Sequence, residues 1–338
     1  MTLARQSFPG TAAREDTADA YPLRVTAVTR EADAVISLTL RHPEGRDLPA
    51  WNPGAHIDLH LPSGRIRQYS LCGSPRNRRE YQIAVLRERS GRGGSAEIHD
   101  LPLTRKQLMV RGPRNHFQLR DSPRYLFIAG GIGVTPVLPM IAEMGPGRPW
   151  AMYYGGRTRT SMAFAADALR TGGDHGHVLP KDETGPLDVD GIVATADART
   201  AVYCCGPPSL LRAVEDACRR LARGASLHTE RFTPGDPAPG EPPGPRGGED
   251  RSFLVELRRS GLTLQVPADR TLLAVIRDAV PEVPCSCEEG YCGSCETKVL
   301  GGQPDHRDEI LSPEERAENN TMMICVGRAL SETLVLDL

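Results

Sequence analysis

The sequence lacks long hydrophobic runs and a large excess of charge of either sign. None of its 338 residues belongs to a run approaching about 18 apolar residues, which excludes a membrane-spanning helix. Lys plus Arg number 41 and Asp plus Glu number 43, so there is no basic excess to bind a nucleic-acid backbone. Residues 1–20 have no apolar signal core, and Glu15 and Asp16 are atypical of a transit peptide. We therefore expect a cytoplasmic protein that binds neither nucleic acid nor membrane.

The composition is nevertheless sufficient for folded domains. Hydrophobic residues make up 39% and charged residues 25% of the chain, which allows a buried core and excludes global disorder. The length corresponds to two or three domains. Nine cysteines, an odd number in a long chain without a secretory signal, indicate metal or redox chemistry rather than structural disulfides.

The sequence pattern changes twice along residues 1–233. Residues 1–21 show no periodicity and are expected to form a flexible tail. Residues 22–120 contain short alternating runs separated by turn signals, which predict an antiparallel β-barrel. In residues 121–233, apolar runs ending in glycine (YLFIAGG, WAMYYGG and AVYCCGPP) alternate with helical stretches. That alternation predicts an α/β domain with a parallel sheet.

A linker separates the last part of the chain from the rest. Residues 234–250 contain 11 Pro or Gly among 17 positions, which indicates a linker rather than a packed element. Residues 251–338 then begin with an expected hairpin and a short amphipathic helix. The sequence therefore predicts three folded domains, the third joined by an extended segment.

Four cysteines in the third domain have the spacing of an iron–sulfur site. Cys287, Cys292 and Cys295 form C-x4-C-x2-C, and Cys325 follows. This is the spacing of a plant-type [2Fe–2S] cluster, whereas structural zinc usually takes two C-x2-C pairs and only one is present. Cys285 is interpreted as a neighbour of the ligands. Three further cysteines are expected to be small core residues: Cys72, Cys204 and Cys218.

Two segments of the expected barrel could hold a flavin. In RQYS (Arg67–Ser70), Arg can pair with a phosphate and Tyr can stack on a ring, although an ordinary half-exposed strand could carry the same residues. In GRGGSAEIHD (residues 91–100), glycines precede Ser95 at the start of an expected helix, where N–H groups favour an anion. A glycine-rich hairpin end explains this second segment equally well.

Two glycine loops follow strands of the expected parallel sheet. GGIGVTP (Gly130–Pro136) is similar to a dinucleotide-binding turn but departs from G-x-G-x-x-G at Thr135 and Pro136. CCGPP (Cys204–Pro208) ends another strand. Because ligands of open α/β sheets bind outside the carboxyl ends of the strands, both loops are expected at one nucleotide site.

Together these motifs resemble the phthalate dioxygenase reductase family, which includes vanillate O-demethylase reductases. The resemblance extends from about residue 22 to the C-terminus. The matching segments are RQYSLC, GRGGS, AGGIGVTP, YCCGPP, ERF, CEEGYCGSC, DHRD and LVLDL.

The resemblance implies an FMN-binding antiparallel β-barrel, an α/β nicotinamide-nucleotide domain and an α+β ferredoxin-like β-grasp domain. It further implies a reductase that takes hydride from NADH or NADPH to FMN and passes single electrons through the cluster to a Rieske-type oxygenase.

The resemblance also assigns residues to these sites. Flavin is assigned to Arg67, Gln68, Tyr69 and Ser70, and its phosphate to Gly93, Gly94 and Ser95. The nicotinamide site is assigned to Gly130, Gly131, Thr135, Cys205, Gly206 and Pro207, with Phe232 near the flavin. Among these, Cys205, Thr135 and Phe232 are the expected catalytic residues.

Some questions remain open at this point. Some relatives place a Lys where this chain has Leu86, so Arg87 or Arg92 would have to supply that charge. The alternative functions are a flavin and iron–sulfur redox sensor, although a sensor needs no hydride entry, and a reductase for another electron acceptor. The chain contains no Cys-x-His pair, so the oxygen chemistry of a Rieske centre is expected on another chain. NADH is the expected donor on resemblance alone, because Arg157 and Arg159 could also attract the extra phosphate of NADPH.

Overall fold

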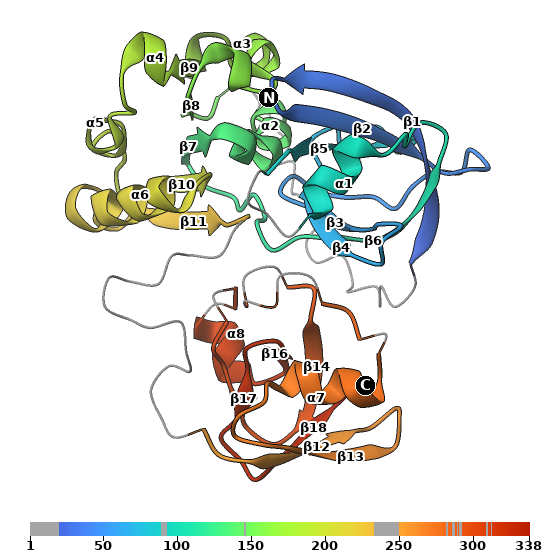
Figure 1. Ribbon diagram of the computed structural model, residues 1–338. Coiled ribbons are helices and arrows are strands. Elements are labelled where there is room, and N and C mark those ends of the chain that lie inside the picture. The colour runs from blue at the N-terminus through green and yellow to red at the C-terminus, as the bar shows by residue number, and fades with distance from the viewer. Residues whose placement is uncertain are drawn as a thin grey trace, which may run out of the picture.

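The structure is a computed structural model of the chain (Figure 1). The described residues are 20–88, 93–144, 147–232, 250–281, 283–285, 288, 290, 293–308, 310–311 and 313–338. Almost all of the expected tail and linker lies outside these residues, as do the expected ligands Cys287 and Cys292.

The first sheet is entirely antiparallel. Its strands are β1 (Tyr21–Ala32), β2 (Val35–Arg41), β3 (His56–His60), β4 (Ile66–Ser70), β5 (Tyr81–Leu86) and β6 (Gln107–Arg114), in the order β4-β3-β6-β1-β2-β5. Helix α1 (Gly94–Asp100) lies between β5 and β6 in the chain. Along β6, Leu108 and Val110 are buried whereas Gln107 and Met109 are exposed, so the strand has one face toward the core.

The second sheet is entirely parallel. Its strands are β7 (Arg124–Gly130), β8 (Trp150–Gly156), β9 (Gly176–Pro180), β10 (Thr200–Cys205) and β11 (Ser226–Glu230), in the order β11-β10-β7-β8-β9. Its helices are α2 (Val134–Ala142), α3 (Ala165–Gly172), α4 (Lys181–Thr184), α5 (Val189–Val193) and α6 (Pro208–Leu221), and its 3-10 turns are Gly131–Gly133, Arg159–Ser161 and Gly173–His175.

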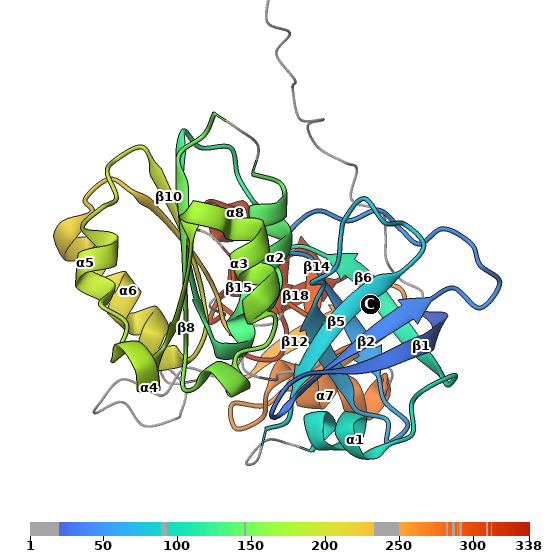
Figure 2. The ribbon, with the colours of Figure 1, turned by 90° about the horizontal axis from the view of Figure 1, so that it is seen from above.

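Both faces of this parallel sheet are covered. Phe127 and Ala129 of β7 pack on the side of α2 and α3, whereas Leu126 and Ile128 pack on the side of α5 and α6. Figure 2 shows the two pairs of helices on opposite sides of the strands. Burial on both faces explains why β7 and β10 are continuous apolar runs in the sequence.

The third unit is a mixed sheet with two helices. Its strands β12 (Phe253–Leu257), β13 (Leu262–Val266), β14 (Glu296–Gly301), β16 (Thr321–Met323) and β18 (Thr333–Leu336) have the order β13-β12-β18-β14-β16, and β15 (Pro304–Asp305) pairs with β17 (Arg328–Ala329). The helices are α7 (Leu272–Ala279) and α8 (Pro313–Glu318). Thr271 caps α7, because its Oγ1 accepts a hydrogen bond of 3.1 Å from the Ala274 N–H.

These three units confirm the predicted fold class. The sequence patterns did not predict two strands of the parallel sheet, β9 and β11, which lie at its two edges. In β11 no residue is fully buried, and the strand carries Ser226, His228 and Glu230. An edge strand packs on fewer neighbours and therefore has no long apolar run to reveal it.

The first two units share one core. Val35, Ala84 and Phe117 from the first unit pack with Phe127 and Val134 of the second. The Phe117 and Tyr203 rings lie 5.4 Å apart, edge to face, an arrangement that aromatic pairs favour. The third unit has its own core, and among the described residues that core contains none from the other two sheets. Figure 1 shows it below the other two.

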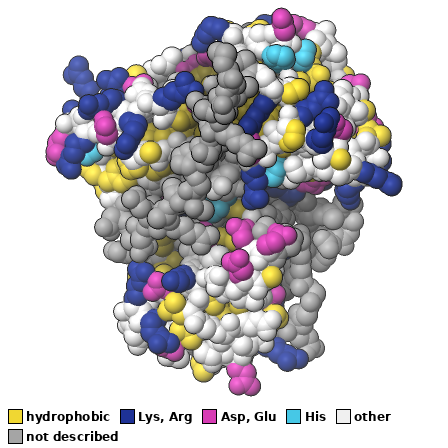
Figure 3. All heavy atoms as spheres, turned by 180° about the vertical axis from the view of Figure 1, so that it is seen from behind, with side chains coloured by type: hydrophobic (Ala, Val, Ile, Leu, Met, Phe, Trp, Pro, Cys, Tyr) yellow, Lys and Arg dark blue, Asp and Glu magenta, His cyan; other side chains and the backbone are white. Residues whose placement is uncertain are grey.

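Basic and acidic side chains occur together on the surface that Figure 3 shows. On the face opposite to that of Figure 1, Lys and Arg side chains are interspersed with acidic and apolar ones (Figure 3). Many arginines have carboxylate partners, as in the pair of Arg41 with Glu80 at 2.6 Å. None of the helices in the described ranges combines the length and apolarity that crossing a bilayer requires.

Candidate functional site

The two glycine loops meet at the carboxyl edge of the parallel sheet. β7 and β10 are hydrogen-bonded neighbours, so their carboxyl ends lie side by side. A Cβ added to Gly133 would lie 2.3 Å from the Cys205 carbonyl oxygen, and one added to Gly206 would lie 3.0 Å from the Gly130 Cα. Glycine is therefore required where the two loops approach each other.

A cavity of about 1200 Å³ opens beside these loops. It lies between the antiparallel and parallel sheets, because its walls include Val35 and Leu86 from the first and Gly155 from the second. The expected nucleotide and flavin residues that line it are Gly130, Gly131, Gly206, Pro207 and Phe232. An extended crevice at this edge suits a dinucleotide.

Cationic side chains are among those that line this cavity. Arg157 and Lys181 line it together with Thr158 and Ser161. Arg159 is not among the lining residues and instead pairs with Glu183 at 2.7 Å. The two arginines that the sequence left equivalent therefore differ in the structure, since only Arg157 faces the cavity.

Three polar side chains converge where the two sheets meet. Ser70 ends β4, Cys205 ends β10 and Glu230 ends β11. Burial raises the pKa of Glu230 to about 8, and the nearby Ser70 side chain partly offsets this rise. Burial and the Glu230 carboxylate also raise the pKa of Cys205 well above its ordinary value. Below about pH 8 this group therefore consists of a neutral thiol, a hydroxyl and a neutral carboxylic acid.

Two buried atoms of this group have few internal partners. Apart from the mutual contact of the two side chains, Ser70 Oγ and Glu230 Oε2 have no hydrogen-bond partner among the described residues, although the rest of Glu230 is partly exposed. Buried polar groups are rarely left unsatisfied in folded proteins. A bound heterocycle with polar edge atoms would satisfy them, so the residues present fit a flavin here.

The expected phosphate residues also lie together. A Cβ added to Gly94 would lie 2.6 Å from the Arg67 Nε, and the Arg65 guanidinium lies 3.7 Å from such an atom on Gly93. Gly93 has φ of 82°, in the region that favours glycine. Ser95 Oγ accepts a hydrogen bond of 3.0 Å from the Glu88 N–H. Because Arg65 pairs with Glu97 at 3.3 Å, Arg67 beside the glycine turn is the guanidinium that fits a phosphate.

The structure shows the surroundings of three other expected residues. Thr135 is buried and its hydroxyl donates to the Ile132 carbonyl at 3.0 Å, so it supports the turn rather than lining the cavity. Tyr69 is mostly buried, and this burial raises the pKa of its phenol. Gln68 donates from Nε2 to Ser294 Oγ at 2.9 Å, toward the third unit.

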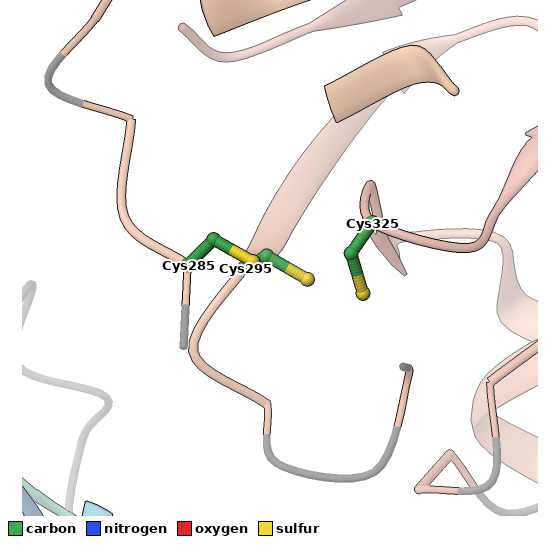
Figure 4. A group of neighbouring side chains, drawn as sticks. All are labelled: Cys285, Cys295 and Cys325. Atoms are coloured by element: carbon green, nitrogen blue, oxygen red, sulfur yellow. The ribbon is translucent and has the colours of Figure 1, made fainter. Parts of the chain in front are cut away.

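A group of buried thiols lies in the third unit. The Sγ atoms of Cys285, Cys295 and Cys325 all lie within 4.8 Å of one another (Figure 4). Hydrogen bonding with the other two thiols lowers the pKa of Cys285. Buried sulfur donors at this separation fit a soft metal centre such as an iron–sulfur cluster. The expected ligands Cys295 and Cys325 belong to this group, while Cys287 and Cys292 lie outside the described residues.

Sequence reasoning did not identify Glu230 and did not place the Cys285 thiol. Glu230 belongs to the ERF motif, but only its position beside Ser70 marks it as functional, and β4 and β11 belong to different sheets. Cys285 is expected to be a neighbour of the ligands, and its thiol lies within 4.8 Å of those of Cys295 and Cys325. The CSC sequence was the one available signal for Cys285.

Glu230→Gln is predicted to change the pH dependence of stability. The folded pKa of about 8 exceeds the ordinary value of 4.5, so the folded chain retains a proton that the unfolded chain releases. The contribution of Glu230 is therefore fully present below about pH 4.5 and is lost as pH rises through about 8. The melting temperature of the wild-type chain should fall relative to that of Glu230→Gln between about pH 5 and pH 9.

The exposed carboxylate of Asp174 provides the control for this comparison. Asp174→Asn removes a carboxylate at an exposed position and is measured alongside. Parallel melting curves for wild type and Glu230→Gln at every pH would show that Glu230 is ionised in the folded chain.

The thiol group yields a second prediction. Cys295→Ala and Cys325→Ala should each lose the visible absorption of the cluster but retain the flavin, because the two sites belong to separate units. Cys285→Ser should retain the cluster, as the C-x4-C-x2-C spacing predicts. Iron content and visible spectra show which variants retain the cluster. A cluster that is lost from Cys285→Ser would make Cys285 a ligand.

Comparisons with known proteins bear on these sites. Residues 255–330 match the family model described as "2Fe-2S iron-sulfur cluster binding domain". "Phenoxybenzoate dioxygenase subunit beta" from Ectopseudomonas oleovorans is 43% identical over 319 residues, which cover 94% of this chain and 97% of that protein.

Two solved structures are similar over most of the chain. A structure of phthalate dioxygenase reductase, described as modular for electron transfer from pyridine nucleotides to a [2Fe-2S] group, is 34% identical, with a TM-score of 0.65 and coverage of 94% of this chain and 98% of that one. An intact type IV self-sufficient cytochrome P450 monooxygenase has 41% identity and a TM-score of 0.84, covering 94% of this chain and 41% of that one. The resemblance predicted from the motifs is thereby confirmed, and the chain belongs to the phthalate dioxygenase reductase family of flavin and iron–sulfur oxidoreductases.

Proposed function

We propose that this chain is the cytoplasmic reductase component of a Rieske-type oxygenase system. The main support is that one chain carries a nucleotide cavity, a flavin site and a ferredoxin-like unit with a buried thiol group. The chain is an oxidoreductase whose cofactors are FMN, a [2Fe–2S] cluster and a nicotinamide nucleotide. When bound, FMN accepts the two electrons of a hydride together and can release them singly.

The residues of the chain contribute positioning and electrostatics. The Gly130–Gly131 and Gly206–Pro207 turns bring backbone close to the bound nucleotide, and Phe232 covers part of the same cavity. Arg67 and the Gly93–Gly94 turn would hold the FMN phosphate. Glu230, a neutral acid below about pH 8, would donate a hydrogen bond to the polar edge of a bound ring.

The Rieske acceptor is supported by the relatives and by an absence in the sequence. A relative similar over nearly its whole length is named as a subunit of a dioxygenase. This chain itself has no Cys-x-His pair, so it lacks half of a Rieske motif. A Rieske acceptor would therefore lie on a separate oxygenase chain.

One observation favours a second acceptor, the haem of a cytochrome P450. The self-sufficient P450 monooxygenase matches this chain at 41% identity, with a TM-score of 0.84. In that protein the matching region is 41% of a longer chain. A separate P450 chain is therefore the alternative partner.

Reconstitution with each acceptor tests the proposal. The purified chain and NADH should reduce the Rieske cluster of an oxygenase component under anaerobic conditions, followed by loss of visible absorption. A ferric P450 haem domain with carbon monoxide serves as the competing acceptor. Cys325→Ala provides the matched control, because it should keep reducing its flavin yet fail to reduce the oxygenase. Faster reduction of the P450 than of the oxygenase would favour the P450 as the partner. If neither acceptor were reduced, a redox sensor would be the favoured function.

The cationic residues that line the cavity yield a prediction about the donor. NADH remains the expected preferred donor, and Arg157 and Lys181 should govern how far NADPH is tolerated, since both face the cavity. Arg157→Ala and Lys181→Ala should each lower kcat/KM for NADPH relative to NADH by up to about tenfold, a change of about 1.4 kcal/mol.

Arg159→Ala is the matched control for the donor measurement. Its guanidinium pairs with Glu183 away from the cavity lining, so the donor ratio should stay within about twofold of wild type. A larger change in Arg159→Ala than in Arg157→Ala would place the phosphate of NADPH at Arg159 instead.

A further inference from the structure

The edge strand of the antiparallel sheet contacts the loop that leads into the thiol group. Gln68 in β4 donates from Nε2 to Ser294 Oγ at 2.9 Å, across 226 positions of sequence. Ser294 is 4% exposed and directly precedes the expected cluster ligand Cys295. One hydrogen bond thus joins the strand that carries the RQYS motif to the thiol-bearing loop, by which we mean the segment Gly293–Glu296.

His116 makes a second contact between the same two units. Its ring stacks on His56 with centroids 5.6 Å apart, and its Nε2 lies 3.8 Å from Glu296 Oε2. A Cβ added to Gly293 would lie 2.8 Å from His116 Nε2. Gly293, with φ of 72°, therefore allows the loop to approach the histidine closely.

These contacts differ in kind from those that join the other two units. The antiparallel and parallel sheets share buried apolar residues, including Val35, Phe117 and Phe127. Among the described residues, the buried core of the third unit includes none from either sheet. Its attachment therefore depends on polar contacts, as is typical of interfaces between units that move relative to each other.

The strand β4 is well placed to serve both cofactors. Arg67 lies against the Gly94 turn, and Ser70 lies beside Glu230 at the other end of the motif. Between them, the Gln68 side chain reaches the third unit instead. A displacement of the thiol-bearing loop would separate it from the strand that holds the flavin site.

We propose that Gln68 and His116 are positioning residues that hold the Gly293–Glu296 segment against the flavin-binding strand. They determine how often the third unit is docked where its cluster can receive electrons, and they leave the nucleotide end of the molecule untouched. The proposal rests on the flavin and cluster assignments and is independent of which oxygenase receives the electrons.

The test uses Ser294→Ala and His116→Leu in the complete chain, loaded with both cofactors. Each variant should lower the ratio of cytochrome c reduction, which requires the cluster, to ferricyanide reduction, which takes electrons directly from flavin. A decrease of about fivefold is expected for one lost hydrogen bond, and a larger one for the double variant. The rate at which NADH reduces the flavin should stay unchanged.

A structural readout accompanies the rates. The radius of gyration from small-angle X-ray scattering should increase in the double variant, because the third unit is released. Ser260→Ala is the matched control, since Ser260 is exposed in the turn between β12 and β13 of the same unit. It should alter neither the ratio nor the scattering.

A double-mutant cycle then identifies the pair. Gln68→Met combined with Ser294→Ala should disturb docking no more than Ser294→Ala alone, because both remove the same hydrogen bond. Visible absorption shows whether each variant retains its cluster. If Ser294→Ala loses the cluster, the rate ratio and the scattering of His116→Leu test the proposal instead, because His116 lies on the other side of the contact. The proposal would be overturned if His116→Leu, and the double variant that combines it with Ser294→Ala, kept the wild-type ratio of cytochrome c to ferricyanide reduction and the wild-type scattering.

Discussion

The nucleotide end of the molecule depends on one close approach of backbone to backbone. The loop after β7 lies so near the end of β10 that a Cβ at Gly133 would lie 2.3 Å from the Cys205 carbonyl oxygen. Any larger residue would have to move one of the two strands, because backbone atoms cannot yield as a side chain does. Gly130 and Gly206, from these two loops, line the crevice at the carboxyl edge. Cys205 at the end of β10 is paired in turn with Glu230 of the neighbouring strand β11.

The energetic environment of this edge follows from its position between two sheets. Residues of the antiparallel sheet complete the core of the parallel sheet, so the place where Ser70, Cys205 and Glu230 converge is removed from water. Water is what normally stabilises a carboxylate, and its exclusion raises the pKa of Glu230 to about 8. The same burial keeps Cys205 a thiol. The chain thereby presents hydrogen-bond donors rather than negative charges at this position, which suits an electron-rich ring.

The sequence predicted those features that depend on neighbours along the chain. β7, β8 and β10 were recognisable because burial on both faces requires continuous apolar runs, and the loops after β7 and β10 because tight turns require glycine. Tertiary relationships could not be predicted in this way. Glu230 lies on an edge strand without an apolar run, and its significance comes from Ser70 on another sheet. Arg157 and Arg159 were equivalent in sequence, yet Glu183 binds only the second. Gln68 was assigned by its neighbours in RQYS, whereas its amide bonds Ser294.

The two kinds of attachment in this molecule match the two kinds of transfer that it performs. Hydride moves only between atoms held in contact and in alignment, so the nucleotide and flavin sites must have a fixed relation. A shared apolar core, with Phe117 packed edge to face on Tyr203, provides that rigidity. A single electron needs no bond to form between donor and acceptor, and the unit that carries it must also present itself to another protein. Few polar contacts, such as that between Gln68 and Ser294, are compatible with both demands, because they can form and break without opening a core.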